Sequence, residues 1–447
     1  MSNTYTDLVK QTFYFPQEGF VTKDGYLHFN DLDLKAIIDK YGTPLKLTYL
    51  PKIGTQINKA KTLFEQAIKK HKYEGKYHYC YCTKSSHFRY VLEEVLKNDV
   101  HLETSSAYDI DLIRRLYTLK KINKTQTIVC NGFKKEEYVQ RILDLKESGF
   151  ENIIPVIDNG YELNVFKERA TSALNIGIRI ASEEEPKFEF YTSRLGIGYR
   201  NITKFYKKVI QEDPNLKLKM LHFFINSGIK DTAYYWNELN KCLQVYVQLR
   251  KICPTLDSLN IGGGFPIKSS LSFEWDYEYM AEGIVETIKK ACDEEDLPHP
   301  NLFTEFGSFT VGESGIMLYS ILNQKQQNDR ELWYMINNSF MTTLPDVWAI
   351  DQRYPMLAIN NWDKECQRVF LGGLTCDSED FYNAEKHNNK IFLPKIGPKD
   401  KPLHLGFFYT GAYQESLSGY GGLKHCLIPA PKHIIIKSNK QISRPTQ

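Results

Sequence analysis

The stretch YHYCYCTKSSHF, residues 77–88, is a strand-like run of aromatic residues and cysteines that ends in a lysine. Because side chains alternate along a strand, Lys84 shares its face with three earlier residues, His78, Cys80 and Cys82. A desolvated lysine at a strand end can attack a carbonyl as the free amine. Taken alone, this stretch favours an exposed strand-end lysine instead. A zinc site is disfavoured because structural zinc ligands usually come in pairs separated by turns, so we expect no metal.

Two further stretches carry complementary chemistry. NIGGGFP, residues 260–266, can direct backbone N–H groups toward a phosphate through its three consecutive glycines, Gly262, Gly263 and Gly264. LFTEFGSF contains Glu305, a carboxylate that can keep a pyridine nitrogen protonated. The alternative for Glu305 is a structural ion pair, with Arg179 as the partner. A nucleophilic lysine, a phosphate-binding turn and this carboxylate together indicate pyridoxal phosphate as the cofactor.

These residues belong to a repeating pattern of elements. Helix-compatible segments separate most of eight β-rich runs, at residues 77–82, 100–103, 126–130, 152–157, 175–180, 219–225, 258–262 and 302–305. The alternation predicts an α/β fold, a (β/α)8 TIM-type barrel. Working residues in such barrels lie at the carboxyl ends of the strands, and phosphate often binds after the seventh and eighth strands. The barrel therefore favours a catalytic role for Lys84.

The rest of the chain has a different pattern. From about residue 310, turn-like polar stretches separate β-like runs, namely IMLYSIL, ELWYMINN, QRVFLGG, LHLGFFYT and HIIIKS. This pattern predicts a mostly antiparallel β domain of sandwich-like or barrel-like form. The β-like piece GYLHF near the N-terminus is compatible with the same domain. We expect the barrel over residues 46–309 and the β domain over residues 1–45 with 310–447.

Composition narrows the class of protein. The net charge is +3, and no basic block is dense enough to indicate nucleic-acid binding. No window approaches the apolar length of a membrane span, and the N-terminus lacks the apolar core of a signal peptide. The nine cysteines are odd in number and irregular in spacing, which favours reduced thiols. We expect a cytoplasmic protein with neither nucleic acid nor membrane as a partner.

Motifs in consistent order resemble one family of enzymes. The chain resembles the fold type III (alanine racemase-like) pyridoxal-phosphate decarboxylases of basic amino acids and diaminopimelate at YCTKSS (81–86), LETSSAYD (102–109), SRLGIG (193–198), NIGGGFP (260–266) and TEFG (304–307). It resembles biosynthetic arginine decarboxylases in particular at CNGFKKEEY (130–138), LPDVWAIDQRYP (344–355) and GAYQE (411–415). The resemblance covers roughly residues 40–425 and implies both the barrel and the cofactor.

The resemblance implies a role for each matched residue of the barrel. Lys84 would be the Schiff-base lysine and Glu305 the partner of the ring nitrogen, with Arg179 beside the cofactor and this glutamate. Phe224 would stack on the ring. Further cofactor contacts would come from Ser227, Gly262, Gly263, Gly264 and Ser308.

The resemblance also implies a homodimer with composite active sites. Cys376 and Asp377, from LTCDSED (374–380), would reach into the neighbouring subunit's site. There Cys376 would act on the carbanion and Asp377 would bind the cationic end of the substrate, with Asp346 a second acidic candidate. Tyr413 would contact the cofactor phosphate from the same partner subunit.

Some positions depart from the family pattern. Phe224 replaces a histidine that stacks on the ring; it can stack but cannot donate a hydrogen bond. Asn226 replaces a glycine, and Ser308 replaces an arginine that binds phosphate, which leaves a weaker contact. Asn338 stands where ornithine decarboxylases have an aspartate, which weakens an ornithine assignment.

The function implied is pyridoxal-phosphate-dependent α-decarboxylation of L-arginine to agmatine and carbon dioxide, a step of polyamine biosynthesis. The first alternative is the same reaction on lysine, ornithine, diaminopimelate or a carboxylated polyamine. Diaminopimelate is disfavoured because its distal carboxylate would meet Asp377. The second alternative, motivated by Phe224 and Ser308, is a catalytically silent relative that binds the cofactor and acts as a regulator.

Overall fold

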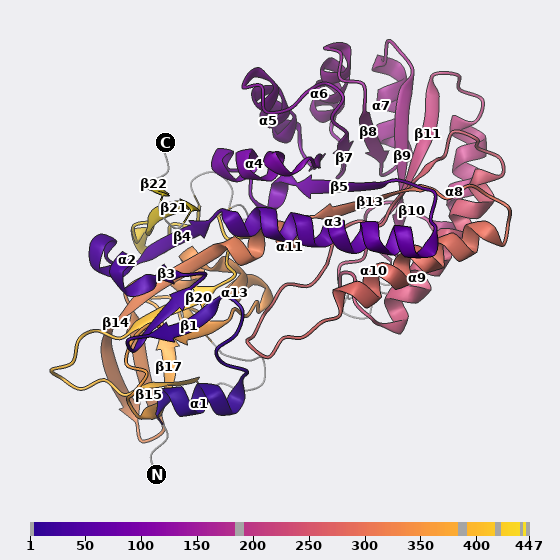
Figure 1. Ribbon diagram of the computed structural model, residues 1–447. Helices are drawn as coiled ribbons and strands as arrows, with labels where there is room; N and C mark the ends of the chain where they lie inside the picture. The colour runs from indigo at the N-terminus through magenta and orange to yellow at the C-terminus, as the bar shows by residue number, and fades with distance from the viewer. Residues whose placement is uncertain (1–3, 184–191, 383–390, 416–421, 439–440, 444–447) are drawn as a thin grey trace. The chain divides into compact units, whose positions relative to one another are not determined.

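The structure is a computed structural model that describes residues 4–183, 192–382, 391–415, 422–438 and 441–443. The chain divides into two compact units. The barrel unit comprises residues 54–266 and 275–310, and the β unit comprises residues 1–53, 267–274 and 311–447 (Figure 1). Among the described helices, none is both long enough and apolar enough to cross a membrane.

Eight parallel strands form the closed sheet of the barrel unit. In spatial order they are β9 (Leu174–Ala181), β11 (Leu216–Phe223), β12 (Ser258–Asn260), β13 (Asn301–Phe306), β5 (Tyr77–Cys82), β6 (His101–Thr104), β7 (Ile128–Cys130) and β8 (Ile153–Ile157). Pairing of β8 with β9 closes the ring. A two-residue strand, β10 (Ile197–Gly198), pairs in parallel with the last two residues of β9. The predicted (β/α)8 barrel is confirmed, with a strand at each of the eight predicted runs.

Among the described residues, one helix leads into the first strand of the barrel, and seven more connect its strands. They are α3 (Pro51–His71), α4 (Arg89–Val95), α5 (Ala107–Thr118), α6 (Glu136–Glu147), α7 (Gly160–Arg169), α8 (Tyr199–Phe205), α9 (Ala233–Arg250) and α10 (Tyr277–Asp293). Several begin directly after a residue whose side chain accepts a hydrogen bond from the first turn, namely Ser106, Asn159, Thr232 and Asp276. These caps fix where the chain turns from a strand end into a helix.

The strands are apolar because the parallel sheet is covered on both faces. All five residues of β8, with the sequence IIPVI, are buried. One cluster of buried side chains joins five of the strands and consists of Cys80, Val129, Ile154, Val156, Met220 and Phe303. The position of Cys80 in this cluster supports the predicted alternation of β5, with its cysteine face turned toward the neighbouring strands.

The β unit is built on a ten-stranded sheet. Its strands are β4 (Leu45–Tyr49), β14 (Gly315–Asn328), β15 (Glu331–Ile336), β16 (Met356–Ala358), β17 (Cys366–Gly372), β18 (Phe381–Tyr382), β19 (Ile391–Pro394), β20 (His404–Phe408), β21 (Lys432–Ser438) and β22 (Gln441–Ser443). Most pairs are antiparallel, as predicted, but β15 with β17 and β4 with β21 are parallel. The N-terminal strand β4 lies between β14 and β21, so segments from both ends of the chain share one sheet.

Smaller elements complete the β unit. A three-stranded sheet is formed by β1 (Phe20–Lys23), β2 (Tyr26–Phe29) and β3 (Leu32–Asp33). Short helices are α1 (Tyr5–Thr12), α2 (Leu34–Tyr41), α12 (Phe340–Thr343) and α13 (Pro345–Ile350), while α11 (Ser308–Val311) follows β13 at the edge of the barrel unit. Phe20 and Phe29 pack on Phe408 of β20, which ties the small sheet to the hydrophobic core of the unit.

Candidate active site

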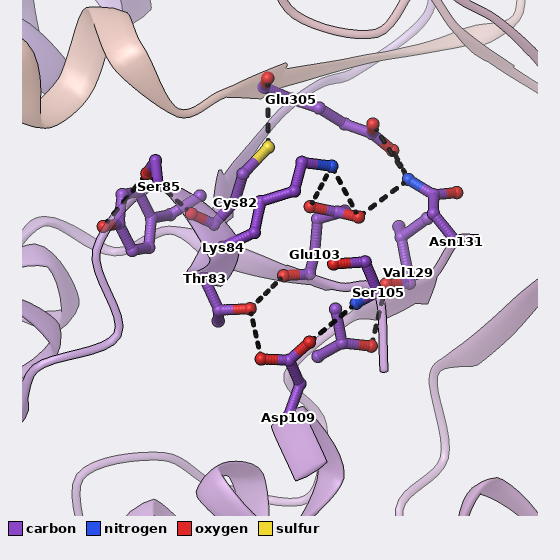
Figure 2. Close-up of polar contacts among 12 residues, drawn as sticks. Cys82, Thr83, Lys84, Ser85, Glu103, Ser105, Asp109, Val129, Asn131 and Glu305 are labelled. Carbon is purple, nitrogen blue, oxygen red and sulfur yellow. Dashed lines mark hydrogen bonds and ion pairs between the residues drawn. The ribbon is translucent and has the colours of Figure 1, made fainter. Parts of the chain in front are cut away.

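Lys84 lies just beyond the end of β5. The strand stops at Cys82, and residues Thr83–Ser85 form a single 3-10 turn, so strict strand alternation does not extend to the lysine. Its Nζ nevertheless lies 3.2 Å from both carboxylate oxygens of Glu103, at the carboxyl end of the adjacent strand β6 (Figure 2). Thr83 fixes the turn, because its hydroxyl donates to the backbone oxygen of Glu103.

Glu103 is fully buried, and its environment opposes ionisation in part. Burial raises the pKa of its carboxyl group, Lys84 lowers it, and the nearby charge of Glu305 raises it again. Lys84 is the basic partner of this carboxylate, and its side chain is 43 % exposed. The amine is therefore anchored by a buried acid while it remains accessible to a ligand.

Glu305, near the end of β13, is surrounded by side chains from other strand ends. Its carboxylate accepts hydrogen bonds from Asn131 at 2.9 and 3.0 Å and from Asn260 at 2.6 Å. His222 Nδ1 lies 3.4 Å away. Burial alone would raise the pKa of Glu305, but His222, Lys84 and Asn131 outweigh burial and hold the pKa well below its ordinary value. Glu305 is thus maintained as a carboxylate in a buried site.

Asn131 links the two buried carboxylates. Its Nδ2 donates both to Glu305 and, at 3.1 Å, to Glu103 (Figure 2). The loop that carries Asn131 is held by Lys134, whose fully buried amine donates to the backbone oxygens of Gly132 and Val156. The buried carboxylate of Glu162 lies 3.4 Å from the same amine. This anchoring fixes the amide that bridges the acids.

Arg179 and Phe224 come from the ends of β9 and β11. The guanidinium carbon of Arg179 lies 5.7 Å from the centre of the Phe224 ring. Burial lowers the pKa of Arg179, and the charges of Glu305 and Asp158 oppose this effect. No described ion pair joins Glu305 to Arg179, and the histidine His222 lies 3.4 Å from Glu305 instead. Arg179 Nε is buried without a hydrogen-bond partner among the described residues.

The glycine turn after β12 has no room for side chains. Gly262 and Gly264 have φ angles of +68° and +117°, which favour glycine. A Cβ on Gly263 would lie 2.0 Å from the backbone oxygen of Glu305, and one on Gly264 would lie 2.5 Å from the Cα of Gly228. Among the described residues, the N–H groups of Gly263 and Gly264 donate no backbone hydrogen bond. Such a close-packed turn with available N–H groups suits an anion.

The remaining predicted residues are divided between the units. Ser227 follows β11 and Ser308 begins α11, both in the barrel unit and both half-buried. Cys376, Asp377, Asp346 and Tyr413 belong to the β unit. Cys376 is exposed, and Asp346 is buried with its Oδ2 accepting a 2.7 Å hydrogen bond from Gln414. The structure therefore brings Lys84 together with Glu305, while the predicted residues of the partner subunit remain an expectation.

Four polar residues of the barrel were not singled out from the sequence, namely Glu103, Asn131, His222 and Asn260. Each lies in the last residues of a barrel strand or directly after it. The runs HLET, CNGF, LHFF and SLN each place a polar residue at the end of a buried apolar run. Because working residues of such barrels lie at the carboxyl ends of the strands, this pattern is enough to mark the four residues as candidates. Their mutual contacts depend on the register between strands.

The residues present fit pyridoxal phosphate. A half-exposed lysine lies beside an ionised, buried glutamate, and the glycine turn leaves backbone N–H groups for a phosphate. Asn131 Oδ1 and Arg179 Nε are buried polar atoms without partners among the described residues, as in a site that receives a polar ligand. Lys84 would anchor the cofactor, Glu305 would face its ring nitrogen and the glycine turn would hold its phosphate.

A closed (β/α)8 barrel with a lysine, a buried glutamate and a glycine turn at its strand ends defines a pyridoxal-binding barrel. Residues 55–312, more than half of the chain, match the family model described as pyridoxal-dependent decarboxylase, pyridoxal binding domain. The chain belongs to this family of carboxy-lyases, and its cofactor is pyridoxal phosphate.

Individual relatives agree with this assignment. The chain is 23% identical to the biosynthetic arginine decarboxylase of Prochlorococcus marinus, over 85% of this chain and 77% of that protein. The crystal structure of the biosynthetic arginine decarboxylase of Campylobacter jejuni is similar with a TM-score of 0.79, 21% identity and coverage of 99% and 88%. Diaminopimelate decarboxylase from M. jannaschii also has a TM-score of 0.79, with 19% identity and coverage of 95% and 94%.

Proposed function

We propose that this protein removes the α-carboxylate of L-arginine and releases agmatine and carbon dioxide. The observation that carries the proposal is the cluster of Lys84, Glu103 and Glu305 at the strand ends, an amine and an ionised carboxylate arranged for a pyridoxal cofactor. The choice of arginine is supported by relatives with that name that align with most of the chain. We also propose a cytoplasmic location, since all nine cysteines are free thiols.

The residues of the barrel have separate roles in this proposal. When bound, pyridoxal phosphate supplies an electron sink for the charge left on the α-carbon after the carboxylate departs. Glu305 keeps the ring nitrogen protonated because it stays ionised beside its hydrogen-bond donors. Lys84 would hold the cofactor covalently through its amine. The Glu103 carboxylate accepts hydrogen bonds from the Lys84 ammonium, and this ion pair keeps the Lys84 side chain at the site during turnover.

Three residues of the β unit complete the proposed site from a second subunit. Cys376 protonates the α-carbon of the substrate. Asp377 binds the substrate guanidinium by accepting two parallel hydrogen bonds from it. Tyr413 contacts the phosphate from the same side. A homodimer is supported by exposed apolar side chains on α13 and in loops of the β unit, namely Trp348, Ile350, Leu374 and Leu427.

The proposal is tested by supplying purified, cofactor-loaded enzyme with arginine, lysine, ornithine and diaminopimelate together and identifying the products by mass spectrometry. We expect agmatine as the main product. The matched control is Lys84→Ala, which should form no product and should lose the absorbance of the covalently bound cofactor. Release of carbon dioxide from none of the four by an enzyme that binds the cofactor would support a silent regulator instead.

A different substrate is the second candidate, because the diaminopimelate decarboxylase fold is as similar by TM-score as the arginine decarboxylase fold. Separate measurements of kcat/KM for each amino acid decide between them. A higher kcat/KM for lysine, ornithine or diaminopimelate than for arginine would replace the substrate but leave the reaction unchanged.

A further inference from the structure

Three side chains of the β unit converge on one point at its surface. The Sγ atoms of Cys376 and Cys426 lie 3.5 Å apart. His425 offers a ring nitrogen to the same point, and one ligand atom from each of the three residues lies within 4.8 Å of the others. Asp377 adds a carboxylate oxygen 3.6 Å from His425 Nε2. This cluster is separate from the strand cysteines Cys80 and Cys82.

The three converging side chains come from two distant parts of the chain, and Asp377 is the sequence neighbour of one of them. Cys376 and Asp377 lie in the loop after β17, and His425 and Cys426 lie in a short 3-10 turn that precedes β21. Zinc sites commonly take their ligands from two separate turns, and here His425 and Cys426 are direct neighbours where about two to four residues usually separate a pair. Cys426 has a φ of +53°, an uncommon conformation for a non-glycine residue. The turn thus holds Cys426 toward Cys376 in an unusual backbone geometry.

The spacing matches a tetrahedral cation. Zinc–sulfur bonds of about 2.3 Å separate two sulfur ligands by roughly 3.8 Å in a tetrahedron, close to the observed separation. His425 Nε2 is buried without a hydrogen-bond partner among the described residues, although its side chain is 40 % exposed. A buried nitrogen without a partner is costly, and a cation at the centre of the cluster would satisfy it.

We infer that Cys376, Cys426 and His425, with Asp377 beside them, form a binding site for a thiophilic divalent cation such as Zn²⁺. On binding, the two thiols release their protons and coordinate as thiolates. Thiolate and imidazole ligands favour zinc over magnesium or calcium, which prefer oxygen ligands. The remaining seven cysteines are buried or half-buried, so these are the two exposed thiols of the chain.

Metal binding has a consequence for activity, and this part rests on the proposed function. Cys376 and Asp377 are the residues that the proposed function sends into the neighbouring subunit's active site. A cation that holds both near Cys426 withdraws them from that site. Zinc should therefore inhibit the enzyme reversibly, because it binds Cys376 beside Asp377 in the β unit and does not need to bind Lys84 in the barrel.

The site is tested by titrating the fully reduced, chelator-treated holoenzyme with Zn²⁺ and, without oxygen, with Co²⁺. We expect one cation per chain and the intense visible absorption of a tetrahedral Co²⁺–thiolate complex. Cys426→Ser and His425→Asn should each weaken binding at least about tenfold. The matched control, Cys366→Ser, changes a half-buried cysteine of the same unit and should bind as the parent does.

Two results would overturn the site. The first is an absence of Co²⁺–thiolate absorption in the reduced parent, and the second is equal zinc affinity in Cys426→Ser. A protein that binds no cation but joins Cys376 and Cys426 in a disulfide on treatment with a peroxide would also overturn it.

An activity measurement separates the site from the proposed function. Zinc should inhibit the parent and Cys366→Ser, and a chelator should restore both. Cys426→Ser should decarboxylate its substrate normally and resist zinc. Zinc binding without inhibition of an active parent would overturn the regulatory consequence alone. Zinc binding by a protein that decarboxylates no amino acid would contradict the proposed function and support the site.

Discussion

At the scale of single residues, the site depends on two buried carboxyl groups with opposite tendencies. The pKa of Glu305 is lowered by His222, Lys84 and Asn131 against the effect of burial, whereas burial raises the pKa of Glu103. Such a divergence between neighbouring acids is typical of residues with different roles in one reaction. Glu305 is suited to a permanent negative charge, and Glu103 is suited to share a proton with Lys84.

The bridge between these acids can be tested by Asn131→Asp. The change replaces a donor to both carboxylates with a third buried carboxylate, so repulsion should raise the pKa of Glu305. We expect kcat to fall by roughly 10- to 100-fold, the equivalent of a lost hydrogen bond to a charged group. Steady-state kinetics over a range of pH measures both effects. The control is Asn201→Asp, an exposed position on α8, and equal kinetics in the two variants would contradict the assignment.

Asp346 gives a prediction about pH and stability. Burial raises the pKa of its carboxyl group, and a hydrogen bond from Gln414 opposes the shift. The folded protein therefore retains this proton to a higher pH than the unfolded chain. As pH rises through the folded-state pKa, the contribution of Asp346 to the free energy of unfolding decreases. Asp346→Asn keeps an acceptor for Gln414 and removes the titration. Thermal unfolding at pH 4 and pH 7 should show a smaller decline, or a larger rise, for the variant than for the parent. Identical differences between the two pH values would refute this account.

At the scale of elements, the ends of β11, β12 and β13 approach one another through glycine. Gly263 packs against the backbone of Glu305, and Gly264 packs against Gly228. The turn therefore does two things: it offers N–H groups to a phosphate, and it sets the position of the strand that carries Glu305. A side chain at this turn would move the phosphate site and the carboxylate together.

Gly263→Ala tests this coupling. The added methyl group meets a backbone oxygen at 2.0 Å, so β13 must shift. We expect a loss of about 1–3 kcal/mol in the free energy of unfolding, typical of overpacking, and weaker cofactor binding. Denaturant unfolding and absorbance titration with pyridoxal phosphate provide the two measurements. Gly198→Ala is the matched control, because its Cβ would meet nothing within 4 Å. Parent-like cofactor affinity in Gly263→Ala would rule out the coupling.

The elements were easier to predict from the sequence than the contacts between them. Parallel strands buried on both faces produce continuous apolar runs, and all eight were recognisable. The two-residue strand β10 was not, because it is too short to leave a pattern. Lys84 and Glu305 were predicted at strand ends, but the bridge through Asn131 was not, since it depends on how β6, β7 and β13 face one another inside the closed ring. The parallel pairing of β4 with β21 likewise joins segments too far apart for local patterns to relate.

At the scale of the whole molecule, the proposed active site needs two chains, because Cys376 and Lys84 would act together from different subunits. Lys84→Ala and Cys376→Ala should each be nearly inactive as homodimers. When the two variants are mixed under conditions that allow subunit exchange, roughly one quarter of parental activity should return, since half of the dimers are mixed and each has one intact site. The control is each variant exchanged with itself. No recovery in mixed dimers demonstrated by mass spectrometry would exclude composite sites.

The path of the chain through the β unit has a consequence for synthesis on the ribosome. Strand β4 leaves the ribosome early, but its two neighbours, β14 and β21, come from the last third of the sequence. The residues of the barrel are made in between and can fold as they emerge. Until β14 has emerged, the nascent chain therefore carries β4 with both edges unpaired, in the state where strands are most prone to pair with other chains. Residues 432–436 thus pair with residues 45–49 and complete the sheet that β4 began.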